Sequence, residues 1–270
     1  MTDNPLISPS RPLIMGHRGN PSAAPENTLE AIKAAVDIGV DFIETDIRLT
    51  SDDRIVLFHD DTLERITGEA DVVSNYTLDD LLSFDMGALY TPDGETYPFK
   101  DKGYKIATLE KSLSMFPDMK FNLDIKDDID DFPQILIDLL IRHGAKNRVV
   151  IGSFHSQQVE RVRGIDSEIM TSAHPGEVKR FVLGMKAHLD RFLVKNPRYF
   201  ALQVPMQSGR IKVISKRFID AAHNRGVAVH VWTINEAETM NELIDLGIDG
   251  IFTDEPQLLK DILSDRGLLT

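Results

Sequence analysis

Short β-rich runs alternate with helical patterns along nearly the whole chain, and this alternation constrains the fold more than any other feature. Such alternation is typical of α/β proteins, because each helix carries the chain back to the start of the next parallel strand. Helical patterns begin near residues 28, 109, 132, 156, 176, 215 and 236. Strands are predicted at residues 13–17, 42–48, 120–126, 149–154, 169–173, 201–205, 227–233 and 250–253.

Eight βα units in a chain of 270 residues predict a (β/α)₈ TIM barrel, since such barrels typically need about 250 residues. A doubly wound open sheet is the alternative fold. The second strand turns at Ser51-Asp52-Asp53, and turn-rich sequence then continues to Lys105. We therefore expect one barrel domain over residues 1–270 with an insertion after the second strand, approximately residues 52–105.

The first helix shows the local signals. Asn27 is placed to cap it and Glu30 to complete a capping box, while Gly39 is placed to end it. This assignment puts residues 17–26 in the loop after the first strand.

Charged side chains gather where the predicted strands end. His17 ends the first strand, and His59 returns toward the strand ends from the insertion. Glu44 and Asp46 are two residues apart on the second strand, so their side chains face the same way, and Asp124 and Lys126 repeat this spacing on the third. Because the carboxyl ends of all barrel strands converge on one mouth, these side chains are expected to meet there.

The gathered residue types suit phosphodiester cleavage. His17 and His59 can serve as acid and base, and Glu44, Asp46 and Asp124 offer hard oxygen ligands for Mg²⁺ or Ca²⁺. Arg18 and Lys126 would face the phosphate. Taken singly, each acid can instead pair with a neighbouring base, and each histidine can be structural. Of the other histidines, His174 is placed within reach of the mouth, whereas His143, His155 and His223 are interpreted as surface or core residues.

Composition narrows the class of protein. A formal net charge of -13 argues against a nucleic-acid partner, because an acidic surface repels phosphate backbones. With no cysteine, a metal must be held by oxygen or imidazole ligands. No apolar run reaches the roughly 20 residues of a membrane span, and the first twelve residues lack a signal-peptide pattern. We expect a cytoplasmic protein with no stable membrane insertion.

A series of short motifs carries a family resemblance. They are Gly16-His17-Arg18-Gly19, Pro25-Glu26-Asn27-Thr28, Glu44-Thr45-Asp46, Thr50-Ser51-Asp52, His59-Asp60, Arg65, Leu123-Asp124-Ile125-Lys126, Val231-Trp232-Thr233-Ile234-Asn235 and Gly250-Ile251-Phe252-Thr253-Asp254-Glu255-Pro256. In this order and spacing the chain resembles glycerophosphodiester phosphodiesterases. The family is built on (β/α)₈ barrels with an insertion after the second strand, and the resemblance covers nearly the whole length.

The resemblance implies metal-dependent hydrolysis of a small-molecule glycerophosphodiester to glycerol 3-phosphate and an alcohol, through a cyclic phosphate. It implies that His17 and His59 are the acid/base pair, that Glu44 and Asp46 bind the cation, and that Glu26 belongs to the same polar shell. We take His17 as the first base. Asp124 departs from the pattern, since the family usually carries glutamate there. Mg²⁺, Ca²⁺ and Mn²⁺ all remain open, as do the leaving alcohol and the oligomeric state.

Two aromatic residues are candidates for contact with the substrate. Trp232 and Phe154 end strands where a flat apolar face can pack on the glycerol carbons, or can simply fill the core.

A phospholipase-D-like enzyme acting on lysophospholipid or sphingolipid headgroups would favour an apolar or basic rim, whereas the insertion is acidic. A non-catalytic phosphodiester-binding barrel would have no need for two histidines, three acids and two bases together.

Overall fold

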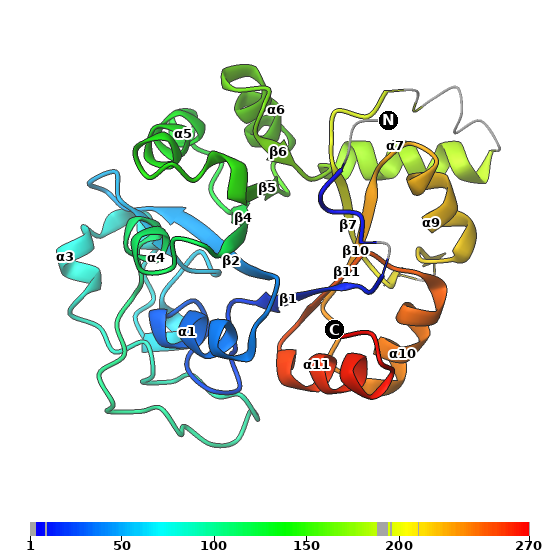
Figure 1. Ribbon diagram of the computed structural model, residues 1–270. Helices are drawn as coiled ribbons and strands as arrows, with labels where there is room; N and C mark the ends of the chain where they lie inside the picture. Colours follow the sequence, from blue (N-terminus) through cyan, green and yellow to red (C-terminus); the bar gives the residue numbers. More distant parts are fainter. Residues whose placement is uncertain (1–3, 9, 188–193, 195, 210, 270) are drawn as a thin grey trace.

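Eight parallel strands form the centre of the molecule in this computed structural model, which describes residues 4–8, 10–187, 194, 196–209 and 211–269 (Figure 1). The strands are β1 (Leu13–His17), β2 (Phe42–Leu49), β4 (Lys120–Ile125), β5 (Val149–Ser153), β6 (Met170–Thr171), β7 (Ala201–Pro205), β10 (Ala228–Trp232) and β11 (Gly250–Thr253). All eight predicted strands are present. The main difference is β6, which keeps two residues of the predicted 169–173.

The sheet closes on itself. Its strands follow the order β6-β5-β4-β2-β1-β11-β10-β7, each parallel to its neighbour. An isolated parallel bridge between Ser172 and Ala201 joins the two ends of this series. The predicted (β/α)₈ barrel is therefore confirmed, and the doubly wound open sheet is wrong.

Helices surround the strands and bury an apolar layer against them (Figure 1). They are α1 (Leu29–Ile38), α4 (Leu109–Met115), α5 (Phe132–Arg142), α6 (Ser156–Ile165), α7 (Pro175–Lys186), α9 (Lys216–His223), α10 (Ala237–Leu246) and α11 (Pro256–Asp265). The sequence interpretation places no helix after the last strand, where α11 lies, although Pro256 at the first helical turn is a usual start signal. None of the helices in the described part of the chain has the length and apolar character needed to cross a membrane.

The start of α1 differs from the prediction. Thr28 is the N-cap, and its hydroxyl accepts a hydrogen bond from the Ala31 N–H at 3.2 Å. Asn27 instead has a φ of 60° and donates its side-chain amide to Asp46 at 2.9 Å. The predicted Asn27 cap and its capping box with Glu30 are therefore wrong, because a buried carboxylate takes the Asn27 amide. Gly39 ends the helix as predicted.

The segment between β2 and β4 has its own small core. It contains β3 (Ile55–Leu57), α2 (Glu64–Thr67), the 3₁₀ turn η1 (Val73–Asn75) and α3 (Leu78–Leu81). Strand β3 pairs antiparallel with β2, which turns the chain back toward the mouth of the barrel. The buried residues of this second cluster are Val56, Phe58, Leu63, Ile66, Val73, Leu81, Met86, Tyr90, Phe99 and Ile106. Residues on both sides of His59 are thus anchored by a packed cluster, not by a loose loop.

Candidate active site

A cavity of about 800 Å³ opens where the carboxyl ends of the strands converge. Nine of the ten predicted site residues line it, and Glu26 lies behind Arg18. The nine are His17, Arg18, Glu44, Asp46, His59, Asp124, Lys126, Phe154 and Trp232. The structure therefore brings together side chains that the sequence spreads over more than two hundred positions.

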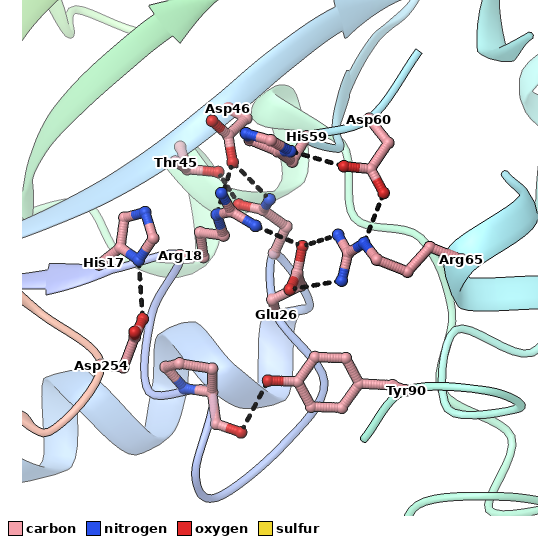
Figure 2. Close-up of polar contacts among 12 residues, drawn as sticks. His17, Arg18, Glu26, Thr45, Asp46, His59, Asp60, Arg65, Tyr90 and Asp254 are labelled. Atoms are coloured by element: carbon pink, nitrogen blue, oxygen red, sulfur yellow. Dashed lines mark hydrogen bonds and ion pairs between the residues drawn. The ribbon is translucent and has the colours of Figure 1, made fainter. Parts of the chain in front are cut away.

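His17 is oriented by a carboxylate. Its Nδ1 lies 2.7 Å from Asp254 Oδ1 (Figure 2). Its Nε2 lies 3.9 Å from Glu44 Oε2. Burial lowers the pKa of His17, but the hydrogen bond to Asp254 and the charge of Glu44 outweigh it, so the pKa is raised overall. Asp254 accepts the proton on Nδ1 and leaves Nε2 available for proton transfer.

His59 repeats this arrangement on the other side of Asp46. Its Nδ1 lies 2.6 Å from Asp60 Oδ1, and Asp60 in turn accepts a hydrogen bond from Arg65 Nε at 2.5 Å (Figure 2). The guanidinium of buried Arg48 donates to the His59 carbonyl at 2.8 and 3.2 Å and also pairs with Asp127. The His59 backbone is therefore fixed to the end of β2.

Glu44 is a buried carboxylate in an unfavourable electrostatic position. Burial and the nearby charge of Asp46 raise its pKa to about 7, against the opposing effect of His17 and Arg18. Its Oε2 accepts a hydrogen bond from the Arg18 backbone N–H at 3.1 Å. A carboxylate with a raised pKa beside a cavity is stabilised when a cation lies against it.

Asp46 and Asp124 share one ammonium group. Lys126 Nζ lies 2.9 Å from Asp46 Oδ1 and 2.7 Å from Asp124 Oδ2. Although burial opposes ionisation, Lys126 and Arg18 lower the pKa of Asp46 to about 2. Burial is the main reason why the pKa of Asp124 is raised. Three carboxylates and one lysine therefore occupy the ends of β2 and β4.

Arg18 belongs to a chain of alternating charges. Its Nε lies 3.2 Å from Asp46 Oδ2, and its Nη1 donates to Glu26 at 2.8 Å (Figure 2). Glu26 also accepts from Arg65 at 2.6 Å, so the chain runs from Arg18 to the Asp60–His59 pair. Gly19 makes this turn possible, because its φ is 93° and a Cβ there would lie 2.7 Å from the Ala31 carbonyl carbon.

The opposite wall of the cavity is mainly apolar. Phe154 follows β5 and Trp232 ends β10, with their ring centroids 6.1 Å apart. Helix α7 adds Val178, Val182 and Leu183, and Val213 lies nearby at the end of a short hairpin. The hairpin strands are β8 (Gln207–Ser208) and β9 (Ile211–Lys212). The cavity thus has a charged half at β1, β2 and β4 and an apolar half at β5, β10 and α7.

His174 is not among the residues that line the cavity. It caps α7, where its Nδ1 accepts a hydrogen bond from the Gly176 N–H at 3.2 Å. Its possible metal-ligand atom lies within 4.8 Å of those of Glu160 and Glu177, a grouping separate from the one that the sequence predicts. Arg163 already pairs with both of these carboxylates at 2.9 Å. The expectation that His174 reaches the mouth is therefore wrong.

Sequence reasoning assigned no role to the carboxylates behind the two histidines. Asp60 directly follows His59, and Asp254 directly follows the last strand, next to β1 in the closed barrel. Because Asp60 is next to His59 in the sequence, its contact with that histidine could have been predicted. Asp254 lies 237 positions from His17, so their contact can be predicted only once the barrel is known to close.

Comparisons with known proteins identify the family of the chain. The profile of the glycerophosphoryl diester phosphodiesterase family matches residues 17–258. The probable glycerophosphodiester phosphodiesterase 2 of Mycobacterium tuberculosis is 32% identical over 261 residues, which cover 94% of this chain and 92% of the relative. A glycerophosphodiester phosphodiesterase of Caldanaerobacter subterraneus is 28% identical and covers 94% of this chain and 99% of its own.

Solved structures show the same fold. The glycerophosphoryl diester phosphodiesterase domain of a Mycobacterium tuberculosis protein has a TM-score of 0.81 at 20% identity, covering 94% of this chain and 99% of the other. An Oleispira antarctica phosphodiesterase in complex with the product sn-glycerol-3-phosphate has a TM-score of 0.75 at 23% identity, covering 94% and 97%. The chain therefore belongs to the glycerophosphoryl diester phosphodiesterase family and is an enzyme that hydrolyses glycerophosphodiesters.

Proposed function

We propose that this enzyme hydrolyses its substrate with His17 and His59 as the acid/base pair. The observation that carries the proposal is that both rings contact a carboxylate through Nδ1, at 2.7 Å and 2.6 Å. A carboxylate that accepts the Nδ1 proton fixes the tautomer, so Nε2 gains or loses the reacting proton. Two such dyads on either side of Asp46 supply a base and an acid to one bound phosphate.

The oxygen donors of the charged half fit a hard divalent cation. Glu44, Asp46 and Asp124 all line the cavity, and hard cations take oxygen ligands. Among the described residues their oxygen atoms do not gather within 4.8 Å of one another, so a bound cation would displace Lys126 from between Asp46 and Asp124. Burial is the main cause of the raised pKa values of Glu44 and Asp124, and the charge of Asp46 adds to both; a bound cation would favour the ionised carboxylates. We assign these three residues as ligands of Mg²⁺, Ca²⁺ or Mn²⁺, which when bound would polarise the phosphate oxygens.

Arg18 and Lys126 would bind the remaining phosphate oxygens. Their positive charges already lie at the carboxylates of the site, and both line the cavity. Glu26 acts through Arg18 by holding its guanidinium. Trp232 and Phe154 would pack on the carbons of the substrate.

The reaction would then proceed in two balanced steps. One histidine removes the proton of the glycerol 2-hydroxyl at Nε2, the oxygen attacks phosphorus, and the bond to the leaving alcohol breaks as the other histidine protonates it. Water opens the cyclic phosphate with the two roles reversed. Taking His17 as the first base stays a prediction. The cytoplasmic location also stays a prediction.

The test is release of glycerol 3-phosphate from glycerophosphocholine by EDTA-treated protein with single metals added back. His17→Ala and His59→Ala should each lower kcat by about a hundredfold or more. His223→Gln is the matched control, because His223 also pairs with an aspartate at 2.7 Å but lies outside the cavity lining. Near-normal turnover in both alanine variants would contradict the acid/base assignment.

A further inference from the structure

One helix turns an apolar face toward the reaction centre. Val178, Val182 and Leu183 of α7 all line the cavity, and Val178 and Val182 lie one helical turn apart. Charged substrates alone do not require such a surface. The wall is also continuous with Phe154 and Trp232, which stand next to the phosphate-facing residues, as the 5.9 Å between Lys126 Nζ and the Phe154 ring shows.

Two large apolar side chains of this wall are exposed. Leu183 retains 54% of its accessible surface and Phe154 retains 64%. Single exposed apolar residues are common, but these two line the same cavity as Val178, Val182 and Trp232. A contiguous apolar surface around a pocket is typical of a binding site.

The charges around the wall complement an anionic amphiphile. Lys179 and Lys186 line the cavity beside the apolar residues of α7. Glu177, the acidic residue of α7, is engaged by Arg163 at 2.9 Å. The acidic surface of the insertion, which argued against a lipid substrate, therefore does not extend to the rim formed by α7.

We propose that the apolar wall is a subsite for a hydrocarbon chain, and that the enzyme acts on glycerophosphodiesters that carry one alkyl or acyl chain. This inference rests on the proposed function for the placement of the phosphate. The 800 Å³ cavity is at the upper end of the range for sites that enclose drug-sized ligands, and a small polar diester would leave its apolar half unfilled.

The chain can enter from either end of the substrate. A chain on glycerol carbon 1 leaves the 2-hydroxyl free for attack, and a chain on the leaving alcohol departs with the first product. Both place a hydrocarbon beside the phosphate, so the same bonds form and break in each case. The shared chemistry is a phosphodiester joined to a single chain.

Binding can be measured without catalysis, because Trp232 is the only tryptophan and lies in the wall. Its fluorescence should be titrated with ethyl, butyl, hexyl, octyl and decyl phosphate, each below its micelle concentration. Burying a methylene is worth about 0.8 kcal/mol, so Kd should fall by about fourfold per added methylene until the chain passes the end of the wall. A Kd that does not change from ethyl to decyl phosphate would overturn the inference.

A pair of matched variants locates the chain. Val182→Gln places an amide in the wall and should reduce the gain in affinity between ethyl and decyl phosphate by at least tenfold. Ile141→Gln is the control, since Ile141 is an aliphatic helix residue with 55% exposure outside the cavity lining, and it should leave the series unchanged. An identical series in Val182→Gln and wild type would show that the chain binds elsewhere, which contradicts the proposal.

Hydrolysis separates this inference from the proposed function. If neither glycerophosphocholine nor 1-acyl-glycerophosphocholine is cleaved while the alkyl series binds as expected, the proposed function fails and the subsite stands. If glycerophosphocholine is cleaved while Kd does not change along the alkyl phosphate series, only the subsite fails. The hydrolysis rates of 1-acyl-glycerophosphocholine and of a glycerophosphoalkanol with an equally long chain are then compared. The faster substrate shows which end of the diester carries the chain.

Discussion

The two halves of the cavity are held in different ways. In the charged half, each functional group is bound to another: Asp254 holds His17, Asp60 holds His59, and Lys126 bridges two carboxylates. In the apolar half, Phe154 and Leu183 remain more than half exposed. Under the two proposals made above, the contrast means that geometry is fixed where bonds would change and left open where the substrate would be selected.

The contrast is tested most strongly at Asp254. Asp254→Asn removes the carboxylate that accepts the Nδ1 proton of His17, and the amide can present an N–H there instead, which favours the wrong tautomer. We expect kcat for glycerophosphocholine to fall by about a thousandfold with little change in KM. Steady-state kinetics with added metal measure this. Asp220→Asn on α9 is the control, and comparable kinetics for the two variants would show that Asp254 does not orient the ring.

A substitution of Arg48 tests whether the buried ion pair that holds the His59 backbone stabilises the charged half more than an exposed ion pair does. Arg48→Met removes the donors to the His59 carbonyl. It also removes the guanidinium partner of the largely buried Asp127 carboxylate, which keeps the hydrogen bond from the Leu49 N–H at 2.8 Å. Breaking such a pair should lower the free energy of unfolding by about 3 kcal/mol. Urea denaturation measures the change. Arg54→Met, which breaks the exposed pair with Glu110, should cost less than about 1 kcal/mol. Equal losses would mean that Arg48 is not a structural anchor.

Phe154 should show the opposite behaviour. Because its side chain is 64% exposed, Phe154→Ala should change the free energy of unfolding by less than about 0.5 kcal/mol. Its loss should still weaken decyl phosphate binding by about fivefold, since an aromatic contact is worth about 1 kcal/mol. Fluorescence titration and thermal melting report the two effects separately. Unchanged binding together with a lowered Tm would assign Phe154 to structure, not to the substrate.

The smallest effect on stability and function together is expected at His223, which lies outside both halves of the cavity. The hydrogen bond to Asp249, reinforced by its charge, raises the pKa of His223 despite partial burial and the charge of Lys216. A raised pKa in the folded state means that the stabilisation is present below the unfolded value of about 6.5 and is lost as pH rises through the folded pKa.

His223→Gln should therefore lower the free energy of unfolding by about 0.5 kcal/mol at low pH and by less at pH 9. Urea denaturation below pH 6.5 and at pH 9 measures the difference in the free energy of unfolding between wild type and variant. Hydrolysis should be unaffected, because His223 does not line the cavity. A difference that grows with pH would contradict the assigned pairing.

The sequence predicts what depends on local pattern. Period-two alternation correctly placed Glu44 and Asp46 on one side of β2, and the βα alternation correctly implied that distant strand ends meet. Two local predictions failed because tertiary contacts competed with them. Asn27 binds a buried carboxylate instead of capping α1, and His174 caps α7 instead of entering the mouth.

Other features of the site could not be derived from local pattern at all. The carboxylate behind His17 comes from the last strand end, and the apolar wall depends on which face α7 turns inward. Helix α7 carries apolar residues on both faces, since Phe181 is fully buried while Leu183 is exposed. Only the packed structure distinguishes the face that supports the barrel from the face that borders the cavity.

The second hydrophobic cluster has a further consequence for the acid/base pair. His17 ends a barrel strand, whereas His59 lies between residues of the smaller cluster, including Phe58 and Leu63. Under the proposed mechanism, the two histidines belong to separately packed clusters that must stay docked for turnover. Opening of the smaller cluster would abolish catalysis while the barrel keeps its secondary structure, so enzyme activity would record a local opening that circular dichroism overlooks.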